Sequence, residues 1–226
     1  MSDARSEDTA RWRAVLFDLD GTLTDPKVGI TRSIQYALRK RGLSPPDADA
    51  LEPLIGPPLE QSFREFFGFD PADARRAVED YREYFSVQGL YENEVYPGIP
   101  ELLRGLRNAG RRVGLATSKP TVYAERILEH FDLAKHFDLI VGSFLDGTRV
   151  DKSEIVATAL AGVADVAPAH VVMVGDRKHD VAGARANGVD AIAVTYGYGS
   201  REELAAASPT SLAESVGELG RLLLLV

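Results

Sequence analysis

The stretch that most constrains the fold is Val15–Asp25, which reads VLFDLDGTLTD. It opens with an apolar run of strand-forming residues and ends in acid, glycine and threonine. This change is typical of a buried parallel strand that carries polar side chains to the carboxyl edge of a sheet, where open α/β sheets bind ligands. Asp18 and Asp20 are two residues apart, so both side chains project to the same side of an extended chain. Two carboxylates this close need a cation or a shared proton, so the stretch predicts a metal site.

Length and charge limit the classes of protein that the chain can belong to. Its 226 residues are enough for one large domain or for a domain with a smaller one beside it. The formal net charge of −8 argues against nucleic acid polymers and anionic membranes as partners, because both favour a basic surface. The absence of cysteine excludes disulfides and suits a reducing cytoplasm, which is the location that we expect.

The order of patterns divides the chain into a core, an insertion and the core resumed. Residues 1–12 are polar and predict a loosely ordered tail. Helical patterns at about 30–41, 59–67 and 71–87 follow the first strand, and no strand is expected between about 26 and 95. An insert of roughly seventy residues is too long for an ordinary connection. We therefore predict an all-helical cap domain at 26–95 and an α/β core formed by 1–25 and 96–226.

The remainder of the chain alternates between strand and helix patterns. Strands are expected at 112–116, 138–141, 171–174 and 191–194, with helices ending near 108 and at 122–130, 153–160 and 179–186. Repeated strand–helix units with short connections predict a Rossmann-like parallel sheet with helices on both faces. The apolar residues 222–226 are too few to span a bilayer and predict the buried end of a last helix.

Polar residues follow further predicted strands at the same sheet edge. Thr117 and Ser118 precede a helix, where a hydroxyl and free backbone amides can bind a phosphoryl group or can simply cap the helix. Asp176 ends another apolar strand, and Asp180 lies in the first turn of the helix after it. Lys152 lies near a helix start, where a lysine is mildly unfavourable. Helix capping or solvent exposure explains each residue alone, but their combination indicates phosphoryl transfer.

These residues resemble the motifs of a known family. The haloacid dehalogenase-like hydrolase superfamily has four ordered motifs, which match Asp18-Leu19-Asp20-Gly21-Thr22, Thr117-Ser118, Lys152, and Gly175-Asp176 through Asp180. The resemblance runs from Val15 to about Gly199, and the helical insertion lies where the alpha-helical caps of that superfamily lie. More closely, the chain is similar to the phosphoglycolate phosphatase-like branch. That branch implies a phosphatase acting on a small phosphate ester, of phosphoglycolate or nucleoside monophosphate type.

The resemblance also implies a role for each motif residue. Asp18 is expected to be the nucleophile that becomes an aspartyl phosphate. Asp20 is expected to protonate the leaving oxygen and then to activate water. Thr117, the Ser118 amide and Lys152 are expected to hold the phosphoryl oxygens.

The resemblance further implies Mg²⁺ as the cofactor. An Asp18 oxygen, the backbone carbonyl of Asp20 and Asp176 are its expected ligands, in keeping with the preference of magnesium for oxygen. Asp180 is expected to hold a metal-bound water or to orient Lys152. Four aspartates would repel a phosphate dianion, and we expect Mg²⁺, Lys152 and one proton on Asp20 to bring the local charge near neutral.

Two other functions stay open at this point. The acid at Asp20 is absent from the dehalogenases and phosphonate hydrolases of the superfamily, which leaves a sugar phosphomutase as the main rival. Mutases of this type commonly use a histidine of the cap, whereas the four histidines of this chain all lie outside 26–95. A catalytically weak binding module is the other alternative. The oligomeric state, monomer or homodimer, is left open.

Substrate recognition is expected to come from the insertion. Residues 56–58, Gly-Pro-Pro, either face the site or form a plain rigid turn. Three basic residues either meet an anionic leaving group or are solvated surface charges: Lys27, Arg32 and Arg64. Four phenylalanines either stack a base or form the insertion's own apolar core: Phe63, Phe66, Phe67 and Phe69. Gly29 and Pro97 flank the insertion and are candidate hinges for closure.

Overall fold

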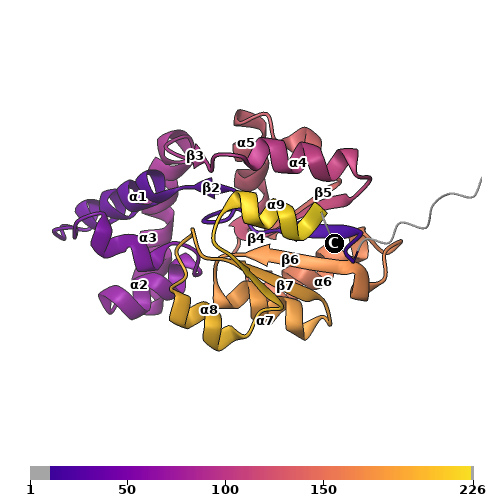
Figure 1. Cartoon of the computed structure of the whole chain (residues 1–226). Helices are drawn as coiled ribbons and strands as arrows, with labels where there is room; N and C mark the ends of the chain where they lie inside the picture. The colour runs from indigo at the N-terminus through magenta and orange to yellow at the C-terminus, as the bar shows by residue number, and fades with distance from the viewer. Residues whose placement is uncertain (1–10, 225–226) are drawn as a thin grey trace, which may run out of the picture.

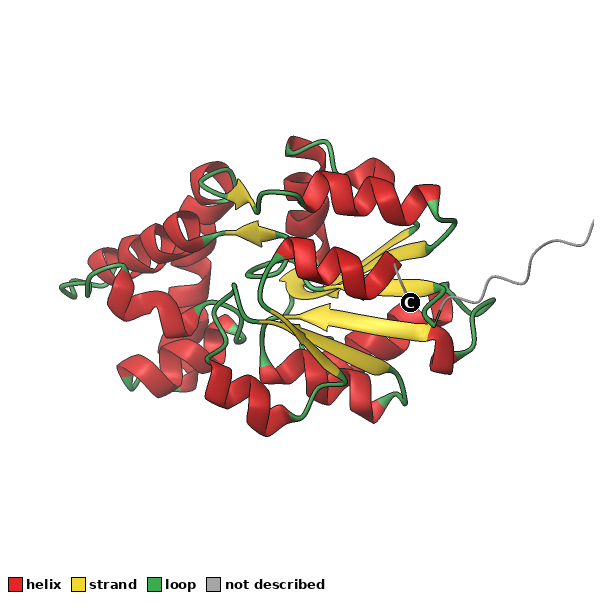
Figure 2. Ribbon diagram, viewed as in Figure 1, coloured by secondary structure: helices red, strands yellow, loops and turns green. Residues whose placement is uncertain are grey.

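The computed structural model describes residues 11–224, which build a six-stranded parallel sheet with a group of helices at one end (Figure 1). The strand order is β5-β4-β1-β6-β7-β8. The strands are β1 (Ala14–Phe17), β4 (Arg112–Pro120), β5 (Leu139–Ser143), β6 (Val171–Gly175), β7 (Asp190–Val194) and β8 (Ser211–Ala213). The arrowheads of the central strands point toward the end at which the group of helices lies (Figure 2). The predicted Rossmann-like α/β fold is confirmed.

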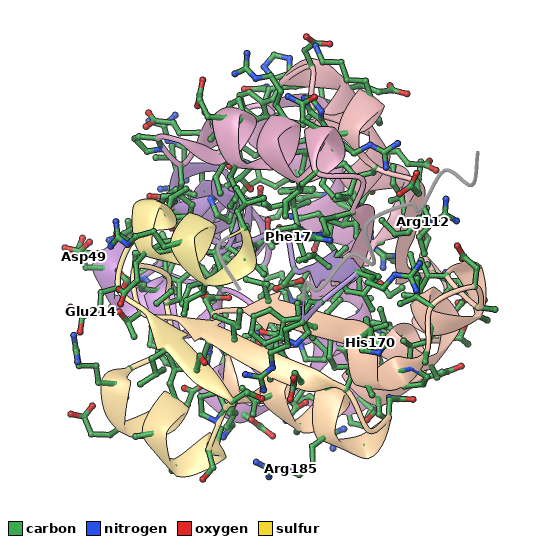
Figure 3. All side chains as sticks on the ribbon, turned by 45° about the vertical axis from the view of Figure 1, so that its right-hand side comes forward. Phe17, Asp49, Arg112, His170, Arg185 and Glu214 are labelled. Atoms are coloured by element: carbon green, nitrogen blue, oxygen red, sulfur yellow. The ribbon has the colours of Figure 1, made fainter. Side chains whose placement is uncertain are left out.

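Helices cover both faces of the sheet. Helices α4 (Ile99–Asn108), α5 (Thr121–His130) and α9 (Val216–Leu224) lie on one face, and α6 (Lys152–Gly162), α7 (Lys178–Ala186) and α8 (Arg201–Ala207) lie on the other (Figure 1). Alternate residues of each central strand supply the two cores: Val15 and Phe17 pack on one side, and Ala14 and Leu16 on the other. Burial on both faces explains why the strands read as continuous apolar runs. Phe17 lies deep in the molecule, whereas Arg185 and Glu214 lie at its surface (Figure 3).

The segment 26–95 is largely helical, as predicted. It contains α1 (Lys27–Lys40), α2 (Leu59–Phe67) and α3 (Pro71–Tyr84), which pack on one another. A short 3₁₀ helix at Asp49–Leu54 and a π-helical turn at Phe85–Gly89 complete it, so α3 ends earlier than the expected residue 87. The buried side chains of this helical insertion belong to the same apolar cluster as one face of the sheet. Its boundary as a separate cap domain stays a prediction.

The expectation of no strand between about 26 and 95 is wrong at one place. The two-residue strands β2 (Thr24–Asp25) and β3 (Glu94–Val95) pair in antiparallel fashion where the chain enters and leaves the insertion. Two residues are too short to show an alternating pattern, so only the tertiary pairing defines them.

Two further predictions concern the chain ends. Most of the expected tail 1–12 lies outside the described residues, but Trp12 is buried and donates a hydrogen bond to Asp190, so it does not belong to a loose tail. The last helix does bury Leu223, and residues 225–226 lie outside the described part. Helix α8 and strand β8 were not predicted. No helix within residues 11–224 combines the length and hydropathy that a bilayer span requires.

Candidate active site

Three strands carry the predicted residues to one point at the carboxyl edge. In the sheet register Phe17 pairs with Leu115 of β4 and with Val174 of β6, so Asp18 lies at the level of Ala116 within β4 and of Gly175 at the end of β6. The Lys152 ammonium lies 2.9 Å from Asp18 Oδ1 and 3.0 Å from the carbonyl oxygen of Ala116. Lys152 is thus held between the end of β1 and the middle of β4.

Asp180 completes the surroundings of Lys152. Asp180 Oδ1 lies 2.7 Å from the ammonium, and both side chains are buried. Burial opposes the charged form of Lys152, but Asp18 and Asp180 outweigh it and raise the pKa of the lysine. This lysine therefore stays a cation and offsets the charge beside Asp18. The surface-residue interpretation of Lys152 is wrong, because the helix start points the side chain into the sheet edge.

Asp176 joins Asp18 and Asp180 in a cluster of buried acids. One carboxylate oxygen of each lies within 4.8 Å of the others. Burial, reinforced by repulsion from Asp180 and Asp18, raises the pKa of Asp176 well above its usual value. Asp176 Oδ2 accepts a 2.7 Å hydrogen bond from the amide of Tyr198, whereas Oδ1 is buried and has no hydrogen-bond partner among the described residues.

This donor set fits a hard divalent cation. Three carboxylates whose oxygens converge, one of them with an unpartnered buried oxygen, form the oxygen-only environment that Mg²⁺ prefers. A cation here would supply Asp176 with the positive partner that it lacks, because the ion pairs of Lys152 within the described residues go to Asp18 and Asp180.

Gly21 is required for this cluster to form. Its φ is +78°, in the left-handed region that favours glycine, and a Cβ at this position would lie 2.1 Å from Asp176 Oδ2 and 2.9 Å from the ring of Tyr198. Any side chain at residue 21 would therefore displace Asp176 from the site. The Tyr198 hydroxyl also donates to Asp25, which ties the loop after β7 to the end of the first motif.

A second buried ion pair was not predicted. Lys119 Nζ lies 2.7 Å from Asp20 Oδ2, and the ammonium also stacks on the ring of Phe85 of the insertion at 4.7 Å. Burial raises the pKa of Asp20, although Lys119 opposes the rise. The sequence signal for this ion pair was a lysine directly after Thr117-Ser118. The direction in which the Lys119 side chain points depends on the irregular end of β4, which the sequence does not reveal. With Lys119 and Lys152 both present, a divalent cation would balance the charge of all four aspartates even without the expected proton on Asp20.

The structure places Thr117 and Ser118 next to this centre. Thr117 is buried directly after Ala116, and its hydroxyl accepts a hydrogen bond of 3.3 Å from the amide of Lys119. Ser118 lines both of the cavities that meet at the site. Thr117 lines neither of them.

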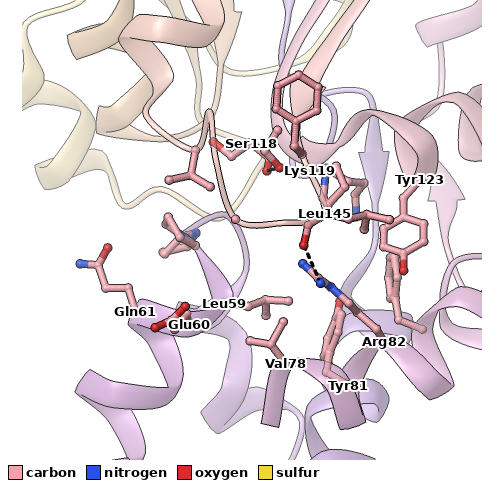
Figure 4. A pocket seen from close by; sticks show the side chains of 18 of the residues that line it. Leu59, Glu60, Gln61, Val78, Tyr81, Arg82, Ser118, Lys119, Tyr123 and Leu145 are labelled. Carbon is pink, nitrogen blue, oxygen red and sulfur yellow. Dashed lines mark hydrogen bonds between the residues drawn. The ribbon is translucent and has the colours of Figure 1, made fainter. Parts of the chain in front are cut away.

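Two cavities open at the junction of sheet and insertion. The larger, about 580 Å³, lies between the insertion and the core: Leu59, Tyr81 and Arg82 line it on one side and Ser118, Lys119 and Tyr123 on the other (Figure 4). Arg82 donates a hydrogen bond of 2.8 Å to the carbonyl oxygen of Leu145 across this cavity (Figure 4). The smaller, about 300 Å³, is lined by the nucleophile candidate and its neighbours: Asp18, Lys152, Arg177, His179 and Asp180. Gly56 and Pro58 line both.

The residues predicted to contact a leaving group lie in different places, and few of them line either cavity. Lys27 is paired with Asp49 and Glu52, and Arg32 with Glu92, and neither basic residue lines the larger or the smaller cavity. Arg64 does line the larger cavity. Phe63 is buried and Phe67 and Phe69 pack against the same cluster, which supports their interpretation as the insertion's apolar core, whereas Phe66 contacts Phe67 but is 47% exposed.

Comparison with known proteins agrees with this geometry. The family model of the haloacid dehalogenase-like hydrolases matches residues 15–194. A Pseudomonas aeruginosa protein named 5′-nucleotidase is 50% identical over 94% of this chain and 96% of its own length. A crystal structure of a predicted phosphatase from Clostridium acetobutylicum has a TM-score of 0.91 at 45% identity and covers 95% of this chain and 99% of that one.

A third relative carries a different name. The Mycobacterium tuberculosis protein named tyrosine-protein kinase PtkA is 42% identical over 87% of this chain, which spans 66% of that protein's length. The three matches cover 87% to 95% of this chain, so each extends over parts of both the core and the insertion. The chain therefore belongs to the haloacid dehalogenase-like hydrolase family, and it is a phosphatase that resembles the phosphoglycolate phosphatase-like branch.

Proposed function

We propose that the chain is a Mg²⁺-dependent phosphomonoester hydrolase that works through an aspartyl phosphate on Asp18. The observation that carries the proposal is the contact of Asp18 with Lys152 in the lining of the smaller cavity. One Asp18 oxygen is bound by the lysine, the side chain is still 9% exposed, and Asp18 lines the smaller cavity, so it can meet an ester there. A carboxylate held in this way can attack phosphorus and divide one slow displacement into two easier ones.

The basic groups and hydroxyls at the strand ends hold the phosphoryl group. Lys152 lies between Asp18 and Asp180, so its position is fixed before substrate binds. Thr117 and the Ser118 amide, at the end of β4 and just before α5, add donors beside it. Asp180 positions the lysine through its 2.7 Å contact.

Asp20 handles the proton on the leaving oxygen. It lines the larger cavity, and one of its oxygens has no hydrogen-bond partner among the described residues. Burial raises its pKa, which favours a carboxyl group that can hold a proton for transfer. Lys119 holds the other oxygen and so orients the group.

The acids of the cluster hold the cation. Asp18 and Asp176 would bind Mg²⁺ with the backbone carbonyl of Asp20, and the unpartnered oxygen of Asp176 supports this assignment. When bound, Mg²⁺ neutralises charge on the phosphoryl group and on the acids around it.

The larger cavity accommodates the leaving group. Its volume of about 580 Å³ is typical of pockets for small metabolites and far exceeds the needs of a two-carbon acid. The 5′-nucleotidase named among the relatives points the same way. We therefore favour a nucleoside monophosphate over phosphoglycolate as the substrate type. The cytoplasmic location, the oligomeric state and the cap-domain boundary stay predictions.

A panel of phosphate esters tests the proposal. Phosphate release is measured from nucleoside monophosphates, 2-phosphoglycolate, sugar phosphates and pyrophosphate, with Mg²⁺ and with EDTA, and Asp18→Asn is the control. We expect Mg²⁺-dependent release, highest from a nucleoside monophosphate. Isomerised sugar phosphate would favour the phosphomutase, and no release from any ester would favour the binding module. Phosphate transfer from ATP to a tyrosine peptide, without hydrolysis of monoesters, would favour a kinase.

A further inference from the structure

Arg177 connects the acid cluster to the helical insertion. It follows Asp176 directly, and its backbone amide donates a hydrogen bond of 3.0 Å to Asp180 Oδ2. Its guanidinium reaches in the opposite direction and donates 2.6 Å from Nη1 to the carbonyl oxygen of Ile55. Two acids of the cluster and a loop of the insertion therefore meet at one residue, although 122 positions separate Ile55 from Arg177.

The other two nitrogens of the Arg177 guanidinium are held by Glu203 of α8. Arg177 Nε lies 3.0 Å from Glu203 Oε1, and Nη2 lies 3.4 Å from Oε2, so the carboxylate of α8 holds the fork from one side. Glu203 Oε1 also accepts from the amide of Lys178, which fixes the carboxylate itself. Because guanidinium is planar, two nitrogens on Glu203 set the direction of the third donor toward Ile55.

The loop that Arg177 contacts borders both cavities. Gly56 has φ +104°, and a Cβ there would lie 3.3 Å from Arg177 Nη1, so the arginine also packs against the backbone of the loop. Gly56 and Pro58 line the larger and the smaller cavity alike, and Arg177 itself lines the smaller. The position of residues 55–58 therefore shapes the space around the ester in both cavities.

We propose that Arg177 is a positioning residue that holds the 55–58 loop over the reacting ester. This inference rests on the proposed phosphatase function for its kinetic consequence, but not for the contact itself. Arg177 touches neither the phosphoryl donors nor Lys152 in any described contact; it acts through the loop. With the loop held in advance, the enzyme does not spend substrate binding energy on ordering it.

The chain offers a matched control. Arg126 also donates from its guanidinium to a carbonyl of the insertion, 2.9 Å from Nη2 to Ser86, and also contacts the Tyr91 hydroxyl. It lines neither cavity. Arg126→Ala therefore removes the same kind of contact between core and insertion without changing the lining of either cavity.

The test compares full-length Arg177→Ala, Arg177→Lys and Arg126→Ala with the parent protein. Amide exchange of residues 54–60 is measured without substrate, together with kcat/KM for p-nitrophenyl phosphate and inhibition by inorganic phosphate. For Arg177→Ala we expect faster exchange at 54–60 and a fall in kcat/KM of about tenfold, the loss of one charged hydrogen bond. Phosphate inhibition is expected to stay within about twofold, because the phosphoryl donors belong to the core.

The other variants separate positioning from charge. Arg177→Lys is expected to behave like Arg177→Ala, because a single ammonium cannot hold Glu203 and reach Ile55 together. Arg126→Ala is expected to keep parental kcat/KM and parental exchange at 54–60. Melting temperatures identify any variant that fails to fold.

Three results would overturn the proposal. The first is unchanged exchange at 54–60 in Arg177→Ala, and the second is full recovery in Arg177→Lys. The third is phosphate inhibition that weakens by the same factor as kcat/KM, which would assign Arg177 to the acid cluster instead. If the parent protein hydrolysed no ester, the proposed function would fail, and the exchange measurements would still decide whether Arg177 holds the loop.

Discussion

Aspartates lie at both edges of the same sheet, but their pKa values are shifted in opposite directions. At the carboxyl edge, burial raises the pKa of Asp176 and Asp20. At the amino edge, Asp138 immediately precedes β5 and Asp190 begins β7, and the pKa of each is lowered. Both lowered values arise in the same way: burial opposes ionisation, but hydrogen bonds outweigh it.

The partners explain the difference. Asp190 accepts hydrogen bonds from the Trp12 indole, at 2.8 Å, and from the Thr210 hydroxyl, at 3.0 Å. Asp176 accepts one backbone hydrogen bond and is surrounded by other acids. Acids of the amino edge therefore stabilise the fold, whereas those of the carboxyl edge are held at a cost in stability that a bound cation would relieve.

The largest effect is expected from the nucleophile candidate. Asp18→Asn removes the attacking oxygen, so phosphate release should fall by about 10⁴-fold or more. Asp190→Asn, an identical change at the amino edge, should leave kcat/KM at the parental value. Steady-state phosphate release on the best ester of the panel measures both, and comparable losses in the two variants would contradict the contrast between the edges.

A large effect on stability is expected at Lys152. Lys152→Met leaves Asp18 and Asp180 buried without their cation, which should lower the free energy of unfolding by about 3–5 kcal/mol in the absence of metal. At the amino edge, Arg107→Met removes a half-exposed partner of Asp138 and should cost less than about 1 kcal/mol. Urea unfolding in EDTA measures both changes. Equal losses would show that burial of the pair at Lys152 does not matter.

Neutralising one acid at each edge should change stability in opposite directions. Asp176→Asn removes a carboxylate that is costly to ionise, so without metal it should raise the free energy of unfolding at pH 8 by about 1–2 kcal/mol. Asp190→Asn weakens the bonds from Trp12 and Thr210 and should lower it by about 1–2 kcal/mol. Destabilisation by Asp176→Asn in EDTA would argue that the acid serves the fold instead.

The smallest effect is a dependence on pH. The pKa of Asp190 is lower in the folded than in the unfolded state, so its stabilisation is present above the unfolded value, about 3.9, and is lost as the pH falls through the folded value. The melting temperature of the parent should therefore approach that of Asp190→Asn as the pH falls from 6 to about 3. Asp176 acts with the opposite sign: because its pKa is raised in the folded state, its contribution to the free energy of unfolding is present at low pH and is lost as the pH rises. A constant difference between parent and Asp190→Asn at all pH values would exclude this linkage.

The residues at the strand ends could be predicted from the sequence because the end of each strand is visible in the local residue pattern. An apolar run that stops at an acid or a hydroxyl, as at Asp18, Thr117 and Asp176, is a local signal, and the parallel sheet then brings the ends together. Lys152 needed the motif order as well, since a lysine at a helix start has no local signature.

The contacts that could not be predicted all depend on where the tertiary structure points a side chain. Lys119 turns toward Asp20 at an irregular strand end, Trp12 reaches Asp190 across 178 positions, and Arg177 reaches the insertion. Strand β8 has only three residues and is defined by its pairing with β7, so its pattern was too short to detect.

The most direct test of the acid cluster as a cation site is the effect of Mg²⁺ on thermal unfolding at pH 8. In the parent protein, Mg²⁺ at about 100 times its dissociation constant should stabilise the fold by about 2.7 kcal/mol. In Asp176→Asn, which starts from the more stable metal-free state, the same concentration should stabilise it far less. An equal shift in both proteins, or no shift in the parent, would contradict the assignment of the carboxyl-edge acids to a cation.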